Sequence, residues 1–206
     1  MAKPYKRQDY LYEQAKEDQY RSRAAYKLLE LDRRYRLLKR GACVLDLGAW
    51  PGSWIQVASE KIGADGLVVG IDLTKIEPLN ENDTNRSSIL LLQRDITSSD
   101  LVAELTNLIT RPIDLVLCDM SPKLSGIKEV DRARMEECAK SAELITHKLL
   151  APRGNFIIKL FQSPEGDRFA RSQARYFDKT VRAELDSTRK SSTEWYFVGL
   201  KFKTDK

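Results

Sequence analysis

VLDLGAWPGSW, residues 44–54, decides the fold, because a short apolar run passes directly into a turn that contains two glycines and a proline. Glycine-rich turns that follow buried strands commonly hold nucleotides. This turn has neither the G-x-G-x-x-G spacing of a dinucleotide site nor the terminal G-K-[ST] of a P-loop. The stretch therefore predicts a buried strand that leads into a ligand site of another kind.

Length and composition favour one globular domain in a reducing compartment. The chain has 206 residues, 42% of them hydrophobic, and no apolar run long enough for a membrane span. The polar, basic start MAKPYKRQDYLYEQ is not a secretory signal. Cys43, Cys118 and Cys138 lack C-x-x-C spacing, which favours buried free thiols over disulfides or a zinc site. We expect a monomeric, cytoplasmic protein that binds neither a membrane nor a metal.

The positive charge is concentrated at the start of the chain. The formal net charge is +5, and residues 1–40 hold 12 Lys and Arg against 6 Asp and Glu. A basic face in this region suits a polyanionic partner such as RNA. A solvated basic helix that binds nothing would have the same composition, so charge alone leaves both interpretations open.

Strands and helices alternate along most of the chain. A polar, basic arm over residues 1–20 precedes a predicted helix over 22–38, ended by Gly41, and a single domain is expected over 21–206. Strands are expected at 43–48, 67–72, 88–93, 113–119, 155–161, 179–185 and 194–201, and further helices at 53–62, 98–109, 131–150 and 165–177. Near-continuous apolar runs indicate buried parallel strands, so the fold class is α/β with a doubly wound sheet. The last two strands are joined too closely for a helical crossover, which predicts an antiparallel pair.

Acidic residues follow three successive strands, where a doubly wound sheet binds its ligands. They are Asp72, Asp95 and Asp119. Several carboxylates would repel a pyrophosphate but suit hydroxyls, an amino group and a cationic centre. Asp72 lies 24 residues after Gly48, where an acid that binds a ribose diol belongs. Asp95 could accept from an adenine amino group and Asp119 could face the cation, which together favour S-adenosylmethionine.

The turn itself would hold the methionine part of that cofactor. Glycines at Gly48 and Gly52 allow a close approach of the backbone, and Trp54 would form a wall of the pocket. The alternative for each strand-end aspartate is a helix cap without a ligand.

Two lysines lie in apolar surroundings. Lys159 is inside the strand-like run NFIIKLF, and Lys27 falls on the apolar side of its predicted helix. An unpaired buried ammonium is costly, so the simple alternative is that both side chains extend their charged ends into water. If both instead lie near an aspartate, they tune each other's pKa, and one can act as a base.

Taken together, these motifs resemble the FtsJ-type ribosomal RNA large-subunit (uridine-2′-O)-methyltransferases in order and spacing, over nearly the whole chain from about residue 20. The matching segments are SRAAYKLLEL (22–31), VLDLGAWPGSW (44–54), IDL (71–73), QRDI (93–96), DLVLCDMSPKLSG (114–126), VDRAR (130–134), APRGNFIIKLFQ (151–162) and SSTEWYFVG (191–199).

The resemblance implies a chemistry and a site. It implies a Rossmann-like S-adenosylmethionine-dependent methyltransferase fold, with a seven-stranded, mostly parallel sheet and one antiparallel strand near the C-terminus. It implies methyl transfer to a ribose 2′-hydroxyl, most directly of a uridine in large-subunit ribosomal RNA. It places a catalytic tetrad on Lys27, Asp119, Lys159 and Glu194. Its cofactor contacts fall on Gly52, Trp54, Asp72, Asp95 and Asp119, beside Gly48 from the turn.

Three residues depart from the family's usual pattern, and other functions stay open. Trp50 and Ser53 stand where small residues are usual, and Lys123 stands where asparagine is common. A 2′-O-methyltransferase acting on tRNA or another RNA is one alternative. A non-catalytic RNA-binding assembly factor is the other, but such a protein should have lost part of the tetrad or of the acidic set.

Candidate phosphate contacts lie in the basic N-terminal region, which also contains Lys27. They are Lys3, Lys6, Arg7, Arg21, Arg23, Arg33, Arg34 and Arg36. A solvated helix is again the alternative for any single arginine.

Overall fold

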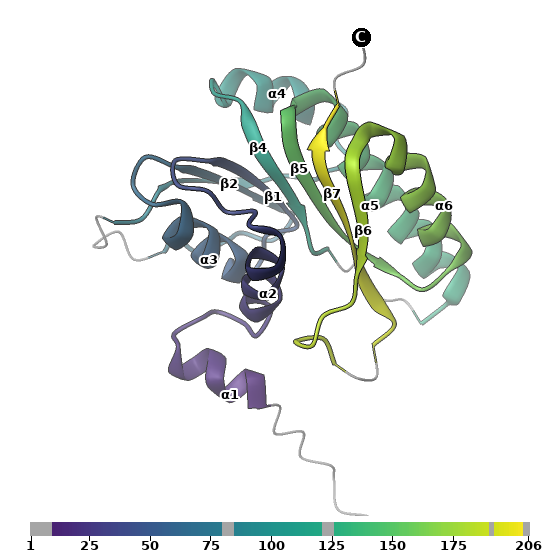
Figure 1. The fold of residues 1–206 in the computed structure, drawn as a ribbon, viewed down its shortest axis with the longest axis horizontal. Coiled ribbons are helices and arrows are strands. Elements are labelled where there is room, and N and C mark those ends of the chain that lie inside the picture. The colour runs from purple at the N-terminus through teal and green to yellow at the C-terminus, as the bar shows by residue number, and fades with distance from the viewer. Residues whose placement is uncertain (1–9, 80–84, 121–125, 190–191, 204–206) are drawn as a thin grey trace, which may run out of the picture.

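Seven strands form one twisted sheet in the computed structural model, which describes residues 10–79, 85–120, 126–189 and 192–203 (Figure 1). The strands are β1 (Cys43–Leu47), β2 (Leu67–Asp72), β3 (Ser88–Gln93), β4 (Ile113–Cys118), β5 (Leu150–Phe161), β6 (Phe177–Ala183) and β7 (Glu194–Phe202). Their order is β3-β2-β1-β4-β5-β7-β6, and only the pairs made by β7 are antiparallel. This confirms the doubly wound α/β class and the single antiparallel strand near the C-terminus.

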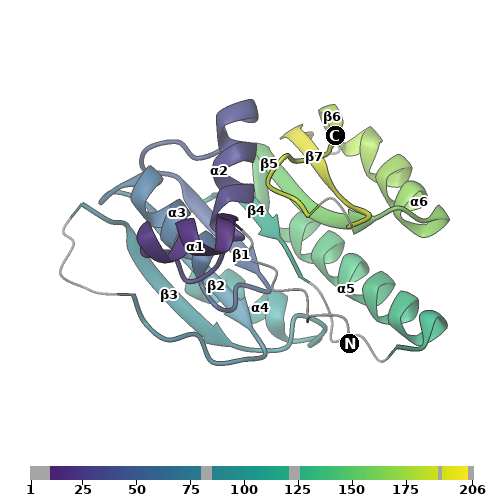
Figure 2. The same cartoon turned by 90° about the horizontal axis from the view of Figure 1, so that it is seen from below.

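Helices cover both faces of the sheet (Figure 2). Helices α2 (Ala25–Tyr35) and α3 (Ser53–Ile62) pack on one face with a core that includes Leu28, Leu31 and Ile55. Helices α4 (Leu101–Leu108), α5 (Lys128–Leu149) and α6 (Pro164–Gln173) cover the other, where a second core includes Leu105 and Phe156. A 3-10 turn, Ala174–Tyr176, joins α6 to β6. No described helix combines the length and apolar character needed to cross a bilayer.

Two element boundaries near the N-terminus differ from expectation. Helix α2 ends at Tyr35 rather than at Leu38, because Arg36 adopts a left-handed conformation and its N–H bonds to the Asp32 carbonyl. The Asp32 side chain then accepts from the N–H of Leu38, which fixes the chain after the helix. Residues Tyr10–Glu17 form a short helix, α1, inside the segment expected to be an arm.

Strand β5 is longer than expected. It begins directly after α5 at Leu150, although Pro152 and Gly154 suggested a break before Asn155. Leu150 pairs with Ile113, and a register shift after this pair absorbs the irregularity. The proline therefore lies within the first part of the strand, next to an irregular section of the ladder.

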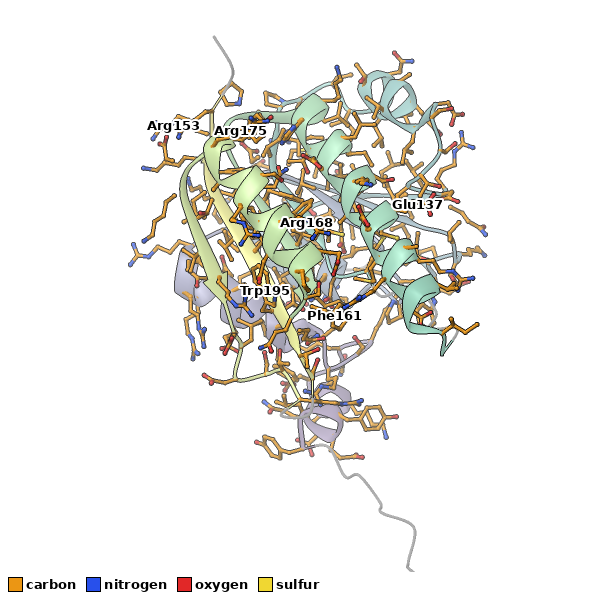
Figure 3. The ribbon with its side chains drawn as sticks, turned by 90° about the vertical axis from the view of Figure 1, so that its right-hand side faces the viewer. Glu137, Arg153, Phe161, Arg168, Arg175 and Trp195 are labelled. Atoms are coloured by element: carbon orange, nitrogen blue, oxygen red, sulfur yellow. The ribbon has the colours of Figure 1, made fainter. Side chains whose placement is uncertain are left out.

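The two edges of the sheet differ in what surrounds them. We call the edge where the parallel strands end the carboxyl edge, and the opposite one the amino edge. Helix α1 lies below the carboxyl edge in Figure 1, and β7 ends at the amino edge. Figure 3 shows Arg153 and Phe161, which lie toward opposite ends of β5 and so mark the two edges.

Candidate active site

A buried lysine is paired with an aspartate at the ends of two neighbouring strands. Lys159 Nζ lies 3.0 Å from Asp119 Oδ1 and donates to the Asp119 main-chain carbonyl at 2.7 Å. The Lys159 side chain is only 5% exposed, so these contacts compensate an ammonium that would otherwise be costly to bury. They occupy two of the three donors of a lysine ammonium, which leaves one for another partner.

A second lysine joins the same group from helix α2. Lys27 Nζ lies 2.5 Å from Glu194 Oε1 and 4.0 Å from Asp119 Oδ1. Glu194 is the first residue of β7 and pairs with Phe161 at the end of β5. Elements α2, β4, β5 and β7 therefore bring all four residues of the expected tetrad together, as a chain from Glu194 through Lys27 and Asp119 to Lys159.

Two hydroxyl groups that sequence reasoning missed complete this group. The Tyr196 hydroxyl donates to Asp119 Oδ1 at 2.7 Å, and the Thr188 hydroxyl donates to Glu194 Oε1 at 3.1 Å. Burial, followed by the charges of Asp119 and Glu194, raises the Tyr196 pKa well above its usual value, so the phenol stays a neutral donor. The sequence contained a signal for Tyr196, because it lies two residues after Glu194 and therefore on the same face of β7.

A buried glutamate fixes the connection that leads into β7. Glu30, 7% exposed, accepts from the N–H groups of Asp186 and Ser187 at 3.0 Å each and from the Ser187 hydroxyl at 2.7 Å. It also pairs with Arg34. Burial raises the Glu30 pKa, but these hydrogen bonds and then the Arg34 charge outweigh it, so the pKa is lowered. Glu30 therefore holds the segment next to Thr188 against the helix that contains Lys27.

The strand-end aspartates predicted to bind a cofactor also hold the loops of the carboxyl edge. Asp72 accepts from the N–H of Trp50 at 3.0 Å and from that of Thr74 at 2.7 Å. Asp95 accepts from the N–H and the hydroxyl of Thr97, both at 2.8 Å. Both residues therefore have structural contacts within loops, but neither is the helix cap that the alternative predicted, since Asp100 is the N-cap of α4. Each carboxylate can accept further hydrogen bonds, so these contacts do not prevent ligand binding.

A fourth acid, which the sequence reasoning did not single out, lies on β1, between the strands that lead to Asp72 and Asp119. Asp46 on β1 is 1% exposed, and its Oδ2 has no hydrogen-bond partner in the part of the chain that the structure describes. Burial, then the charges of Asp119 and Asp72, raises its pKa well above the usual value. The charges of Asp72 and Asp119 both act on Asp46, so negative charge is concentrated at the carboxyl edge although burial opposes the ionisation of Asp46 itself. That potential suits the ammonium, sulfonium and hydroxyl groups of S-adenosylmethionine.

Glycine is favoured at both positions of the turn, as expected. In the structure, however, the groups that lie close to these glycines are protein side chains. Gly48 and Gly52 have φ values of 76° and 102°, which favour glycine. A Cβ on Gly48 would lie 1.9 Å from Cγ of Met120, and one on Gly52 would lie 2.8 Å from Nη1 of Arg21. The space expected for the methionine part of the cofactor is therefore bordered by Met120, a side chain flexible enough to move.

Trp54 lies in the core rather than along an open pocket wall. It is 3% exposed, its indole N–H donates to the carbonyl of Ala24 at 2.7 Å, and its ring packs 6.1 Å from that of Tyr196. Its backbone N–H, however, lies in the first turn of α3, where amide groups lack partners within the helix. Any cofactor contact would come from this N–H, which suits a carboxylate.

The residues that depart from the family pattern have different surroundings. Trp50 is 57% exposed beside the turn, whereas Ser53 is buried and accepts a hydrogen bond from the Ser22 hydroxyl at 2.8 Å. Lys123 lies outside the described residues.

Three of the arginines expected to contact RNA are bound within the protein. The Arg21 guanidinium donates to the carbonyls of Pro51, Glu77 and Pro78 at 2.5–3.0 Å. Arg23 donates to the Ser187 carbonyl at 2.6 Å, and Arg34 donates to the Glu184 carbonyl at 2.7 Å besides its ion pair. These three side chains fix loops. Of the other candidates, Arg33 and Arg36 are exposed, and Lys3, Lys6 and Arg7 lie outside the described residues.

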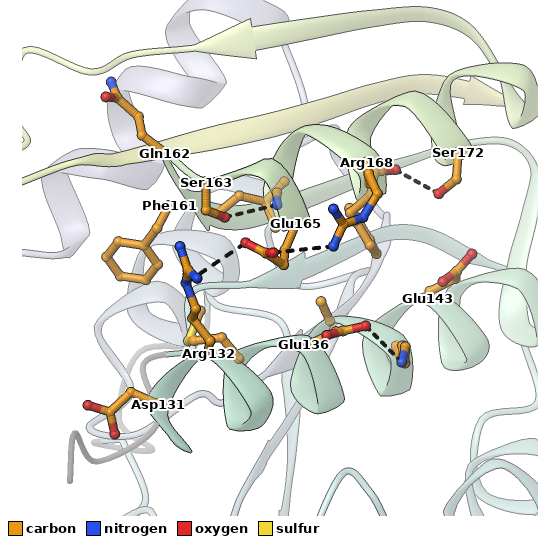
Figure 4. Close-up of a pocket in the computed structure, with 16 residues that line it drawn as sticks. Asp131, Arg132, Glu136, Glu143, Phe161, Gln162, Ser163, Glu165, Arg168 and Ser172 are labelled. Atoms are coloured by element: carbon orange, nitrogen blue, oxygen red, sulfur yellow. Dashed lines mark hydrogen bonds and ion pairs between the residues drawn. The ribbon is translucent and has the colours of Figure 1, made fainter. Parts of the chain in front are cut away.

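A hollow of about 650 Å³ lies between α5 and α6, on the face of the sheet opposite to α2 (Figure 4). Apolar side chains, including Met135 and Phe169, line it together with charged groups that pair with each other. The pairs are Arg132 with Glu165 at 3.9 Å, Arg168 with Glu165 at 3.2 Å and Lys140 with Glu136 at 2.9 Å. None of the predicted site residues lines this hollow, so we do not assign the chemistry to it.

Comparison with known proteins gives a consistent result. Residues 20–202 match the family model of the FtsJ-like methyltransferases. The chain is 40% identical to the ribosomal RNA large subunit methyltransferase E of Methanobrevibacter smithii, over 98% of this chain and 93% of that protein. It is 37% identical to the protein of the same name from Methanococcus aeolicus, over 96% and 71%. The fold matches the crystal structure of a Plasmodium falciparum protein described as a ribosomal RNA methyltransferase, with a TM-score of 0.74, 26% identity and coverage of 89% and 98%.

Proposed function

This chain belongs to the FtsJ-like methyltransferases, and from that premise we propose that Lys27, Asp119, Lys159 and Glu194 carry out its chemistry. The protein is an S-adenosylmethionine-dependent enzyme that methylates a ribose 2′-hydroxyl of large-subunit ribosomal RNA, at a uridine. One observation carries the proposed roles: two contacts with Asp119 leave one position on Lys159 Nζ, which holds a lone pair when the lysine is a neutral amine.

We assign two tasks to Lys159. S-Adenosylmethionine, when bound, supplies a methyl group activated by a sulfonium. Lys159, as the neutral amine, would hold the sugar hydroxyl in line with that methyl group. Its lone pair would accept the hydroxyl proton while the methyl group passes from sulfur to oxygen, so that the S–C bond breaks as the O–C bond forms. Alignment supplies much of the rate, and proton acceptance contributes roughly 10²–10⁴-fold. Asp119 fixes the direction of the Lys159 side chain by its two contacts.

The two acidic residues of the tetrad give each lysine a carboxylate partner of its own. Glu194 lies 2.5 Å from Lys27, whereas Asp119 lies 3.0 Å from Lys159 and 4.0 Å from Lys27. Lys27 therefore has its own counter-charge, and the Asp119 carboxylate is left mainly to Lys159. Tyr196 adds a neutral hydrogen bond that keeps the Asp119 carboxylate in place.

The cofactor would be held by groups of the carboxyl edge. Asp72 would accept from the ribose hydroxyls, and Asp95 from the adenine amino group. Asp72 and Asp119 give the electronegative surroundings that suit the ammonium and the sulfonium. The unpaired backbone N–H groups at the start of α3, including that of Trp54, suit the cofactor's carboxylate.

The test is Lys159→Ala, with labelled methyl transfer to large-subunit ribosomal RNA from a strain that lacks the protein. We expect kcat to fall by roughly 10²–10⁴-fold, while the S-adenosylmethionine affinity, measured by calorimetry, stays unchanged. Lys179→Ala, which removes an exposed lysine of β6, is the matched control and should retain full activity. Normal turnover by Lys159→Ala would refute the role of Lys159. Transfer by the unaltered enzyme only to tRNA would refute the ribosomal substrate.

We further propose that residues 1–20 form an RNA-binding arm on a single catalytic domain, residues 21–206, and that the protein acts as a cytoplasmic monomer. All four tetrad residues come from one chain, which supports activity without a second copy. The three cysteines are free, which supports a reducing compartment.

A further inference from the structure

A second hollow, of about 470 Å³, lies at the amino edge of the sheet, on the side away from the tetrad. Segments that precede β1, β4 and the regular part of β5 form it. We call it the basic hollow, because it is lined by Lys39, Arg40, Arg111 and Arg153 against a single carboxylate, Asp114. None of these residues takes part in the chemistry or in cofactor binding as proposed above.

Part of the basic hollow is fixed by hydrogen bonds within the protein. Asp114 Oδ2 accepts from the N–H of Cys43 at 2.8 Å, which holds the carboxylate against the start of β1. Arg111 donates to the carbonyls of Asp65, at 2.9 Å, and of Gly41. These interactions join the start of β4 to the start of β1 and give the hollow a defined wall.

The other cations have no counter-charge in the described part of the chain. Lys39, Arg40 and Arg153 are exposed, and none of them forms an ion pair with a described carboxylate. The Arg40 guanidinium lies over Gly63, where a Cβ would come within 3.1 Å of its Cζ. The absence of a side chain at Gly63 therefore leaves room for Arg40 in this position.

Their arrangement contrasts with two other regions of the protein, the hollow between α5 and α6 and the carboxyl edge. The charges around the hollow between α5 and α6 are paired, and the carboxyl edge is electronegative, whereas the basic hollow has a clear excess of positive charge. Unpaired guanidinium groups bind phosphate oxygens in a bidentate manner, and concentrated positive charge attracts polyanions.

We propose that the basic hollow binds phosphate groups of the RNA substrate at a point distant from the methylated nucleotide. The inference rests on the proposed function, because that function identifies RNA as the polyanion. Arg153 and Lys159 are six residues apart on β5, which corresponds to about 20 Å. Figure 3 shows Arg153 at the end of β5 opposite Phe161. Under this proposal the enzyme contacts a folded RNA at both edges of its sheet. A short RNA bound at the active site would not reach the basic hollow.

The test removes two of the unpaired charges, with Arg40→Gln and Arg153→Gln in one variant. Binding to a transcript of large-subunit ribosomal RNA is measured across a range of salt concentrations. We expect weaker binding and a salt-dependence slope that is smaller by about one for each phosphate that the variant no longer binds, so by about two. A pentanucleotide, which spans less than about 20 Å when stacked, should bind both proteins equally.

The matched control is Lys140→Gln with Arg168→Gln, which removes two cations that already have carboxylate partners. It should leave the salt slope unchanged, and Arg40→Lys with Arg153→Lys should retain the slope because it keeps both charges. An unchanged slope in the Gln variant, or an equal decrease in the control, would overturn the inference.

Failure of the inference about the basic hollow can be distinguished from failure of the proposed function. S-Adenosylmethionine affinity and the position of the transferred methyl group report on the carboxyl edge, whereas RNA affinity and salt slope report on the basic hollow. If the unaltered enzyme methylates RNA and the double Gln variant binds it with full affinity, only the present inference is refuted.

Discussion

Asp46 shows how one buried carboxyl responds to its neighbours at the carboxyl edge. It is 1% exposed, and burial, then Asp119 and Asp72, raises its pKa. The folded protein therefore holds the Asp46 proton more tightly than the unfolded chain does. The resulting stabilisation is complete below the unfolded pKa of about 4 and is lost as the pH rises through the folded value.

Asp46→Asn should remove this pH dependence. Above pH 4 the variant should gain stability relative to the unaltered protein, by about 1–3 kcal/mol at pH 8, because it has no carboxyl group to ionise. Urea unfolding at several pH values measures the difference. Asp65→Asn, at an exposed loop position, should leave the profile unchanged. Parallel stability–pH curves for Asp46→Asn and the unaltered protein would contradict the assignment.

At the scale of elements, helix α2 serves the site from two positions one turn apart. Lys27 reaches the tetrad, and Glu30 holds the connection between β6 and β7 through Asp186 and Ser187. Thr188, the next residue, donates to Glu194. A single helix therefore positions both a lysine and the glutamate that balances its charge.

Glu30→Ala should affect both stability and turnover. The change leaves two backbone N–H groups without their acceptor and Arg34 without its buried partner, so we expect a decrease of about 3 kcal/mol in unfolding free energy. We also expect a lower kcat with unchanged S-adenosylmethionine affinity, because the Thr188–Glu194 hydrogen bond loosens.

The control for this change is Glu60→Ala on α3, which breaks the more exposed pair with Arg86 and should cost about 0–1 kcal/mol. Denaturant unfolding and methyl-transfer assays measure both variants. A Glu30→Ala protein with unchanged kcat would show that the segment before β7 is not positioned by α2.

At the scale of the whole molecule, two thiols report on the integrity of the sheet. Cys43 and Cys118 lie in β1 and β4, and both are buried and free. Burial raises the pKa of Cys43 to about 11 and that of Cys118 to about 12. The reactive thiolate is therefore scarce at neutral pH, and the packed cores on both faces restrict access to it.

Both thiols should resist alkylation at pH 8 until the sheet opens. Iodoacetamide labelling followed by mass spectrometry, with and without urea, should show that modification of Cys43 and Cys118 follows global unfolding. Cys138 on α5 is only half-buried and should react earlier. Rapid native labelling of Cys43 would contradict a closed sheet at β1.

The pattern of apolar residues was sufficient to predict the central elements. The boundaries expected for α3, β2 and β3 agree with the structure at both ends. Continuous apolar runs with glycine or polar residues at their ends specify such elements locally, both in the buried strand β2 and in the half-buried edge strand β3. The same pattern indicated which ends of the strands meet, and so the neighbourhood of Asp72, Asp95 and Asp119.

The sequence by itself therefore determined the fold and the family, and it predicted the tetrad that the family implies. Only the tertiary structure showed that Tyr196 supports Asp119, that Glu30 binds a segment more than 150 residues away, and that Arg21 fixes loops. It alone also brought Arg40 and Arg153 to one hollow. The physical reason is that local patterning specifies which residues are buried, whereas the partner of each polar group depends on how segments distant in the sequence pack against each other.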